Sequence, residues 1–390
     1  MAESIPVSAK VLKWARESAG LTVADVVIKV NRKRVTSDVI DAWELGIKAP
    51  SYPQLERLAY EVYKRPLAMF FFPEPPEEVT AKQSFRTLPE YEIDSMSAKI
   101  RFLLRKAQAY QHNVYELYDG VNPAEKQIIK DLAFDLSTSI SEMGKQVREY
   151  LSVTLKEQSS FGNPELAFKE WRKILEELGV FVFKDAFKED DFSGFCLYDD
   201  KFPIIYVNNS KSFNRQIFTL FHELAHLLFK TGGIDTHIDD YIDYLHGDDK
   251  QIEIICNRFA GEFLVPTEIF IQETKAITVN EESISLLANN YNVSREVILR
   301  KFLDQGRIDQ DLYQSKVDLW KNVASGDKSS SGGNYYFTKG AYLGSKYIDK
   351  VFSQYYQDRI TTERLADYLD VKVKNISGIE SLIYKAEPST

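Results

Sequence analysis

Residues 214–230 read NRQIFTLFHELAHLLFK, a stretch without proline or glycine that predicts one continuous helix. Apolar side chains surround this helix on nearly every side, so we expect it to be buried. The stretch contains the pattern H-E-x-x-H, formed by His222, Glu223 and His226. Residues four positions apart lie on one face of a helix, so the two imidazoles should point at a common spot. Burying two histidines and a glutamate needs a compensating partner, and a bound metal ion is such a partner.

The H-E-x-x-H pattern indicates a zinc site. Two neutral imidazole nitrogens one helical turn apart are typical ligands of Zn²⁺. Glu223 leans toward the same spot and can hold a water molecule bound to the metal. The alternative is a pair of hydrogen-bonded core histidines, which is disfavoured because the chain has only 5 histidines in 390 residues.

A third metal ligand has to come from another element, because a catalytic zinc ion usually takes three protein ligands and keeps one position open. A helix predicted over about 251–264, ended by Pro266, offers Glu253 and Glu262. Glu253 is the first choice and Glu262 the second, although a glutamate near a helix N-terminus is also favoured by the helix dipole alone. Asn257 follows Glu253 by four residues and is expected to hydrogen-bond an imidazole N–H.

The loop 231–250 between the two ligand helices carries further polar residues. His237 and His246 are within reach of the metal, but the favoured interpretation is that both are solvated. Five aspartates of this loop lack the spacing of a calcium-binding loop and are interpreted as a solvated lid: Asp239, Asp240, Asp243, Asp248 and Asp249. His112 falls on a long amphipathic helix and is expected to be structural.

Composition sets the class of protein. With 390 residues, of which 44% are hydrophobic and 27% charged, the chain is expected to form two or three globular domains. Its net charge of −9 argues against a protein coated in basic charge for nucleic acid. Cys196 and Cys256 are too few for a disulfide framework. The N-terminus lacks an apolar leader and no apolar run approaches about 20 residues, so we expect a cytoplasmic protein.

The pattern of the remaining segments predicts a mostly α protein with a small β-sheet, the α+β class. The sheet should form from three apolar runs placed just before the H-E-x-x-H helix: 180–184, 194–198 and 204–208. Further helices are expected at 95–118, 137–152, 168–178, 283–303 and within 334–384. A proline-rich stretch at 66–78 and a Ser/Gly-rich stretch at 325–333 predict domains at 1–75, 80–320 and 334–390, the last of unknown role.

Residues 1–75 predict a bundle of short helices of the helix-turn-helix kind. They hold 11 Lys/Arg and 9 Asp/Glu, a net charge of +2, so phosphate binding is plausible only here. Arg32, Lys33 and Arg34 precede a helix that Thr36 or Ser37 begins, and they are candidates to grip phosphates, with Ser37 as a candidate base reader. Two carboxylates on the same helix, at positions 38 and 41, would face the DNA unfavourably. The competing interpretation is a module that binds protein.

Two segments resemble the ImmA/IrrE family of metallopeptidases. QIFTLFHELAHLLF at 216–229 is followed by EIICNRFAGEFLVP at 253–266, and the family has the pattern E-x-x-x-N-x-F-A…P after its HExxH. FRTLP at 85–89, GVFVF at 179–183 and PIIYVN at 203–208 also resemble this family, and the similarity spans roughly 80–310. The resemblance implies a thermolysin-like HExxH core with Glu253 as the third zinc ligand.

The N-terminal segment resembles the XRE class of helix-turn-helix domains. AWELG at 42–46 and APS at 49–51 match its W-E-x-G…P-S segment. The combined resemblance implies a zinc-dependent endopeptidase that cleaves a regulatory protein, namely a transcriptional repressor, in a stress, phage or mobile-element response. Expected partners are that protein substrate, DNA through the N-terminal domain, and a second copy of the chain, with no membrane.

The implied mechanism is metal-assisted amide hydrolysis, in which Zn²⁺ polarises the scissile carbonyl and lowers the pKa of its bound water toward about 7. Glu223 then takes the proton of that water and passes it to the leaving amine. The strand 203–208 is expected to pair with an extended substrate segment, as sheet edges do. The alternative function is a non-proteolytic DNA-binding regulator or antitoxin-like protein with a structural metal site. The intact motif favours the peptidase, because a structural site has no need of Glu223.

Overall fold

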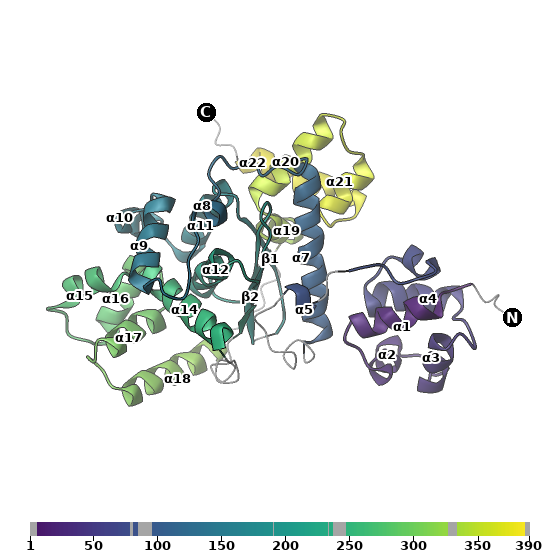
Figure 1. Cartoon of the computed structure of the whole chain (residues 1–390), viewed down its shortest axis with the longest axis horizontal. Coiled ribbons are helices and arrows are strands. Elements are labelled where there is room, and N and C mark those ends of the chain that lie inside the picture. Colours follow the sequence, from purple (N-terminus) through teal and green to yellow (C-terminus); the bar gives the residue numbers. More distant parts are fainter. Residues whose placement is uncertain are drawn as a thin grey trace. The chain divides into compact units, whose positions relative to one another are not determined.

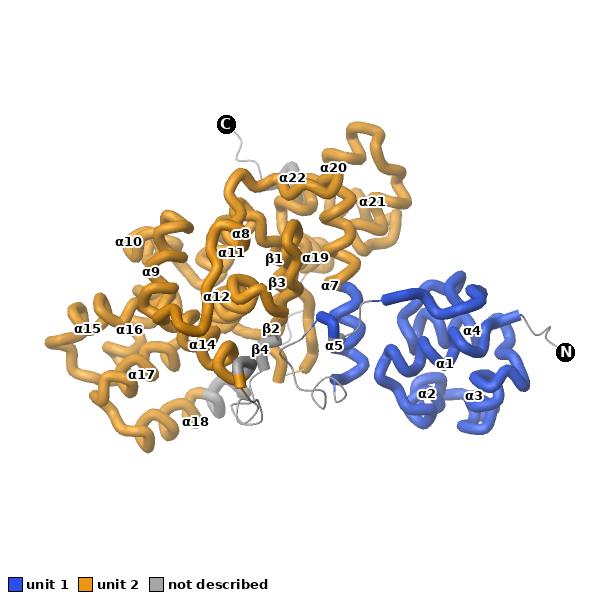
Figure 2. Tube along the Cα trace, in the orientation of Figure 1, with its two compact units in different colours: residues 1–84, 89–106 blue, residues 85–88, 107–390 orange. Residues whose placement is uncertain are grey.

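Figure 1 shows the computed structural model, which describes residues 6–78, 81–84, 96–189, 191–232, 234–236, 247–326 and 334–386. Its elements are mostly helices with one small β-sheet, so the predicted α+β class is confirmed. The chain forms two compact units (Figure 2). Unit 1 comprises residues 1–84 and 89–106, and unit 2 comprises residues 85–88 and 107–390. None of the helices that the structure describes is long and apolar enough to cross a membrane.

Unit 1 contains a bundle of short helices around one core. Its members are α1 (Ala9–Ser18), α2 (Val23–Val30), α3 (Ser37–Glu44), α4 (Tyr52–Arg57), a π-helical segment (Leu58–Tyr63), a 3₁₀ turn (Leu67–Phe71) and α5 (Ala81–Ser84). Ile40 and Trp43 of α3 are buried, as their spacing predicts. Thr22 is the N-cap of α2 and forms a capping box with Asp25. Arg16 of α1 and Glu44 of α3 form a bidentate ion pair, with Nε–Oε1 2.7 Å and Nη2–Oε2 2.8 Å.

Unit 2 is built around a four-stranded sheet of order β1-β3-β2-β4. The strands are β1 (Phe181–Asp185), β2 (Phe192–Leu197), β3 (Ile204–Asn208) and β4 (Ile234–Thr236). The predicted hairpin is confirmed, since β2 and β3 pair antiparallel, while β1 pairs parallel to β3. Because β3 lies between β1 and β2, it has no free edge. The expectation that strand 203–208 pairs with substrate is therefore wrong.

Both faces of the sheet are covered, which explains why its strands are apolar throughout. On one face, Val182, Cys196 and Val207 belong to the core shared with α11 (Pro164–Glu177) and α12 (Phe213–Leu228). On the other face, aromatic rings stack. Phe183 lies 4.6 Å (ring centroids) from Tyr110 of α7 (Ala98–Leu117) and 5.1 Å from Tyr347 of α20 (Ser345–Tyr356). The sheet is thus held between helices on both faces, and α12 packs against one of these faces.

The remaining helices complete unit 2 (Figure 1). They are α8 (Ile128–Asp131), α9 (Ile140–Leu151), α10 (Leu155–Ser160), α14 (Gly247–Leu264), α15 (Thr267–Thr274), α16 (Glu281–Tyr291), α17 (Arg295–Asp304), α18 (Gln310–Gly326), α19 (Tyr335–Leu343), α21 (Thr362–Tyr368) and α22 (Ile376–Ala386). The segment predicted as helical over 283–303 is two helices. Asn292 ends α16 with a left-handed φ of 53°, and Ser294 caps α17.

Gly194 allows α12 to pack closely on β2. A Cβ atom at this position would lie 2.5 Å from Thr219 Cγ2 and 2.9 Å from the Tyr206 carbonyl oxygen. Gly194→Ala should therefore lower the free energy of unfolding by about 1–3 kcal/mol, as overpacked cores do. The matched control is Gly261→Ala in α14, where a Cβ meets nothing within 4 Å. That change should raise the free energy by up to about 1 kcal/mol through helix propensity. Urea denaturation of both variants measures the difference, and equal effects would contradict the packing argument.

Candidate metal centre

The candidate metal centre lies where α12 and α14 pack against each other. The contact is made by large aromatic side chains, with Phe221 of α12 stacked on Phe263 of α14 at 4.1 Å between ring centroids. Trp171 of α11 packs edge-on against both rings. This apolar contact holds the two helices in a fixed relation, so that polar side chains up to about three turns away are brought together.

His222, His226 and Glu253 converge in this interface. The two Nε2 atoms are 3.2 Å apart, and Glu253 places Oε1 3.2 Å from His222 Nε2 and Oε2 3.1 Å from His226 Nε2. All three side chains are buried. Within the described part of the chain, this is the only group of three or more His, Cys, Asp or Glu side chains close enough to share a metal ion.

The donor set fits zinc in both chemistry and spacing. Two imidazole nitrogens and one carboxylate are the ligands of many catalytic zinc sites. Tetrahedral ligands at about 2.0–2.2 Å from zinc lie roughly 3.3–3.6 Å from one another. The observed separations of 3.1–3.2 Å approach this range. The three side chains therefore need to move little to hold a zinc ion.

Electrostatics keep Glu253 in the form that a metal ligand requires. Burial by itself raises the pKa of a carboxyl, but the two imidazoles outweigh it and hold the pKa of Glu253 well below its ordinary value. The carboxylate is therefore ionised at neutral pH. Nearby, burial is the main cause that raises the pKa of the Cys256 thiol, and the negative charges of Glu253 and Glu223 add to it. Cys256 is consequently a neutral thiol and no competing ligand.

Glu223 occupies the position between the two histidines on α12 and is fully buried. Its charge acts on Cys256 of α14, so its carboxylate lies toward the same helix that carries Glu253. Because a buried carboxylate in an apolar interface is costly, its presence calls for a function or a positive partner.

Thr231 supports His226, a role that we did not assign from the sequence. Its hydroxyl lies 3.4 Å from His226 Nδ1 and donates to the His226 carbonyl oxygen at 3.1 Å. Lys230, with a left-handed φ of 57°, turns the chain back at the end of α12 and delivers Thr231 to this place. The Lys-Thr-Gly-Gly run after the helix is a weak signal for such a turn.

Two predicted roles on α14 are corrected. The Asn257 amide donates to the backbone oxygen of Glu253 at 3.3 Å, not to or from an imidazole, because residues four apart on a helix reach each other's turn more easily than the neighbouring helix. Glu262, the second choice for a ligand, accepts from Lys301 Nζ at 2.7 Å and from the Thr267 backbone N–H at 2.9 Å. Burial opposes ionisation, yet these bonds lower the pKa of Glu262. It lies nine residues beyond Glu253 and belongs to a different cluster.

Not every predicted residue lies in the described part of the chain. His237 and His246 lie outside the described residues, as do Asp239, Asp240 and Asp243 and the segment 85–89. Asp248 and Asp249 belong to the first turn of α14 and not to a loop. His112 is exposed on α7, where its Nε2 lies 3.3 Å from Glu116 Oε1.

The candidate DNA-binding residues of unit 1 lie together at the start of α3. Arg32, Lys33 and Arg34 are exposed in the segment that joins α2 to α3, and Ser37 is the exposed first residue of α3. Asp38 and Asp41 are exposed on the same helix. The helix-turn-helix domain and its DNA-binding residues stay predictions.

Comparison with known proteins bears on the metal centre. Residues 175–303 match the family model described as the IrrE N-terminal-like domain, Peptidase_M78. No curated protein matches the chain. The matched segment runs from the end of α11 to α17 and contains all three converging side chains together with Glu223. The segment that carries the candidate metal centre is thus similar to the IrrE N-terminal-like peptidase domain, in support of the ImmA/IrrE resemblance.

Proposed function

We propose that this protein is a zinc-dependent endopeptidase that cleaves a specific regulatory protein, a transcriptional repressor, in a stress, phage or mobile-element response. The observation that carries the proposal is the buried convergence of His222, His226 and Glu253 beside Glu223. The match to Peptidase_M78 suggests the same class of activity. The choice of a repressor as substrate rests on the resemblance to the ImmA/IrrE family.

Each polar side chain of the site has a distinct role in this proposal. His222, His226 and Glu253 hold the zinc ion, which supplies Lewis acidity toward the scissile carbonyl when bound. Glu223 takes a proton from the attacking water and delivers it to the nitrogen of the leaving amine. Thr231 positions the His226 ring through Nδ1 and so sets the direction in which Nε2 points.

The N-terminal domain is the proposed selector of the target. An XRE-type helix-turn-helix domain at 1–75 would bring the peptidase to the repressor, by binding the repressor itself or the DNA next to it. Arg32, Lys33, Arg34 and Ser37 are the proposed contacts with DNA, and their exposure supports this role. Domains at 80–320 and 334–390 and a homodimer remain part of the proposal.

The test combines metal analysis with a cleavage assay on the full chain. Protein purified from zinc-replete cells should contain about one zinc ion per chain, as a site with three protein ligands predicts. Incubation with the repressor encoded nearest to its gene should yield two defined fragments. A chelator should stop cleavage and added zinc should restore it. A zinc-loaded chain that cleaves no such repressor would favour the alternative, a DNA-binding regulator or antitoxin-like protein with a structural metal site.

A further inference from the structure

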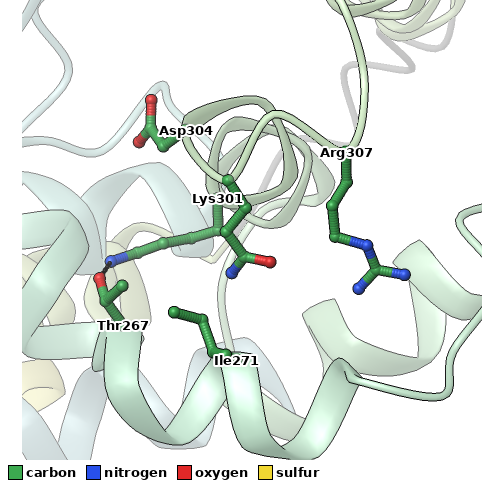
Figure 3. Close-up of a pocket in the computed structure, with 6 residues that line it drawn as sticks. Thr267, Ile271, Lys301, Asp304 and Arg307 are labelled. Carbon is green, nitrogen blue, oxygen red and sulfur yellow. Dashed lines mark hydrogen bonds between the residues drawn. The ribbon is translucent and has the colours of Figure 1, made fainter.

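A pocket lies in unit 2, outside the group of metal-ligating side chains. It has a volume of about 390 Å³ and is lined by residues of α15, of α17 and of the turn after α17: Thr267, Ile271, Lys301, Asp304, Gln305 and Arg307 (Figure 3). Pockets that bind small molecules have volumes of roughly 300–1,000 Å³. The size of this pocket therefore suits a ligand of a few heavy atoms.

Arg307 brings a positive charge to the pocket that no described carboxylate pairs with. The other lining charges are compensated: Lys301 Nζ lies 2.7 Å from Glu262 Oε2, and Asp304 Oδ1 lies 3.0 Å from Arg300 Nε. Arg307 donates only to backbone carbonyl oxygens, which are neutral. In the view of Figure 3, the carboxylate of Asp304 and the guanidinium of Arg307 lie at opposite ends of the pocket. The Arg307 end is therefore electropositive.

Two residues that line the pocket, Arg307 and Gln305, have hydrogen-bond donors to spare. A guanidinium carries five N–H groups, and Arg307 uses Nη1 on the Thr274 oxygen and Nη2 on the Ile277 oxygen. The side-chain nitrogen of Gln305 is buried and has no hydrogen-bond partner. Such a donor costs free energy unless an acceptor is supplied. Because no hydrogen bond holds this amide, it can rotate toward a bound acceptor without breaking a protein contact.

Part of the pocket lining is apolar. Ile271 of α15 is 47% exposed, a large fraction for an isoleucine that lines a pocket. The Phe302 ring lies 4.9 Å from the Arg307 guanidinium carbon, so the guanidinium rests on an aromatic surface that limits its motion. The pocket thus combines charge-assisted donors with an apolar contact.

We propose that this pocket binds a small organic anion, a monocarboxylate with a short branched apolar body. The carboxylate accepts hydrogen bonds from Arg307 and Gln305, and the apolar body covers Ile271. One uncompensated positive charge suits one carboxylate better than inorganic phosphate, which carries more charge and has no apolar part. A purely structural role for Arg307, which is to bind the backbone carbonyls at and after the end of α15, uses only two of its donors. Such a role does not explain the unpartnered Gln305 amide or the exposed Ile271.

The test uses 4-methylpentanoate as the probe and the full chain in a buffer free of other carboxylates. Ligand-observed NMR should detect binding of 4-methylpentanoate, and weaker or no binding of the neutral 4-methylpentanamide or of inorganic phosphate. Arg307→Gln should raise the Kd at least about tenfold, the effect of losing one charge-assisted hydrogen bond. Gln305→Leu should also raise the Kd, by several-fold. Because this change removes no protein hydrogen bond, it tests the proposal even if Arg307→Gln disturbs the fold. The control is Arg295→Gln, also on α17 but paired with Glu281 and outside the pocket.

Three outcomes would overturn the proposal. The first is equal binding of the amide and the carboxylate, which would make the charge irrelevant. The second is unchanged binding in both Arg307→Gln and Gln305→Leu, which would place the probe elsewhere, for example on the zinc ion. The third is phosphate binding as tight as that of 4-methylpentanoate. The readout involves no hydrolysis, so none of these results bears on the proposed peptidase activity.

Discussion

Replacing Glu223 with glutamine is expected to leave zinc bound and to slow peptide-bond hydrolysis by a factor of about 10²–10⁴, the contribution of a positioned general base. Glutamine has nearly the same shape as glutamate, so it fills the same fully buried space on α12. Its amide cannot accept the proton of the attacking water. The measurement is kcat/KM on the cleaved repressor, together with the zinc content of the same preparation.

Glu253→Gln is the matched control, because it makes the same chemical change at a proposed ligand. A neutral amide is a poor zinc ligand, so this variant should lose zinc affinity by more than the roughly 10–100-fold seen for residues that only support a ligand. The two variants therefore distinguish the proposed general base from the proposed zinc ligand. Glu223→Gln should keep the zinc ion and lose activity, whereas Glu253→Gln should lose both. Wild-type hydrolysis by zinc-loaded Glu223→Gln would refute the role of Glu223.

The parts of the site that lie within one helix could be predicted from the sequence. His222 and His226 share a face because of helical periodicity alone, and the predicted helix 214–230 differs from α12, Phe213–Leu228, by one residue at its start and two at its end. Placing Glu253 next to the two imidazoles depends in addition on the contact between α12 and α14, which periodicity does not predict. The sequence offered Glu253 and Glu262 as alternatives, and the choice depended on family resemblance until the geometry brought Glu253 to the imidazoles.

Features that depend on contacts between elements were missed. The left-handed turn at Lys230 gives Thr231 its place against His226, and a lysine at such a position carries no clear signal. The strand order placed β3 inside the sheet, since the parallel partner β1 comes from before the hairpin and β4 from after α12. Helix ends marked by a strong cap are local features, and Thr361, which accepts from the Arg364 backbone N–H at the start of α21, is such a cap. Contacts between elements that are far apart in the sequence carry no such local signal.

Lys184 is buried to a degree that the sequence did not indicate, and its environment has a measurable consequence. The predicted strand 180–184 ends at this lysine. In the structure it lies inside β1, only 3% exposed, with its ammonium 4.4 Å from the Phe168 ring centroid and 5.0 Å from that of Phe213. No ion pair joins it to a carboxylate in the described ranges. Burial, with a smaller contribution from the charge of Arg172, lowers the pKa of Lys184 to about 7.

This lowered pKa makes the stability of the protein depend on pH in a defined direction. The pKa is 10.5 for an unperturbed lysine and about 7 in the folded protein. Between these values the unfolded chain binds more protons than the folded one, so the free energy of unfolding rises with pH. The cost of burying Lys184 is fully present below pH 7 and is relieved as the pH approaches 10.5. Its size is on the order of 5 kcal/mol, because each unit by which a pKa changes corresponds to about 1.4 kcal/mol.

Lys184→Met should therefore raise the free energy of unfolding at pH 7 by on the order of 2–4 kcal/mol. The methionine keeps the unbranched stem against Phe168 and Phe213 and adds a favourable contact between sulfur and the rings. Urea denaturation of both proteins at pH 7.0 and 9.5 measures the gain, which should shrink at the higher pH because the wild-type lysine is then mostly neutral. All other titrating groups are common to both proteins and cancel in the difference.

The control for Lys184→Met is Lys169→Met, an exposed lysine of α11 whose Nζ lies 2.8 Å from Glu165 Oε1. Surface substitutions of this kind change the free energy of unfolding by less than about 0.5 kcal/mol, at either pH. A Lys184→Met variant that is less stable than the wild type, or whose gain is the same at pH 7.0 and 9.5, would mean that the lysine reaches solvent in the folded protein. A gain that falls as the pH rises from 7.0 to 9.5 would instead identify the buried ammonium as the cause, because removing its proton on folding costs less free energy at the higher pH.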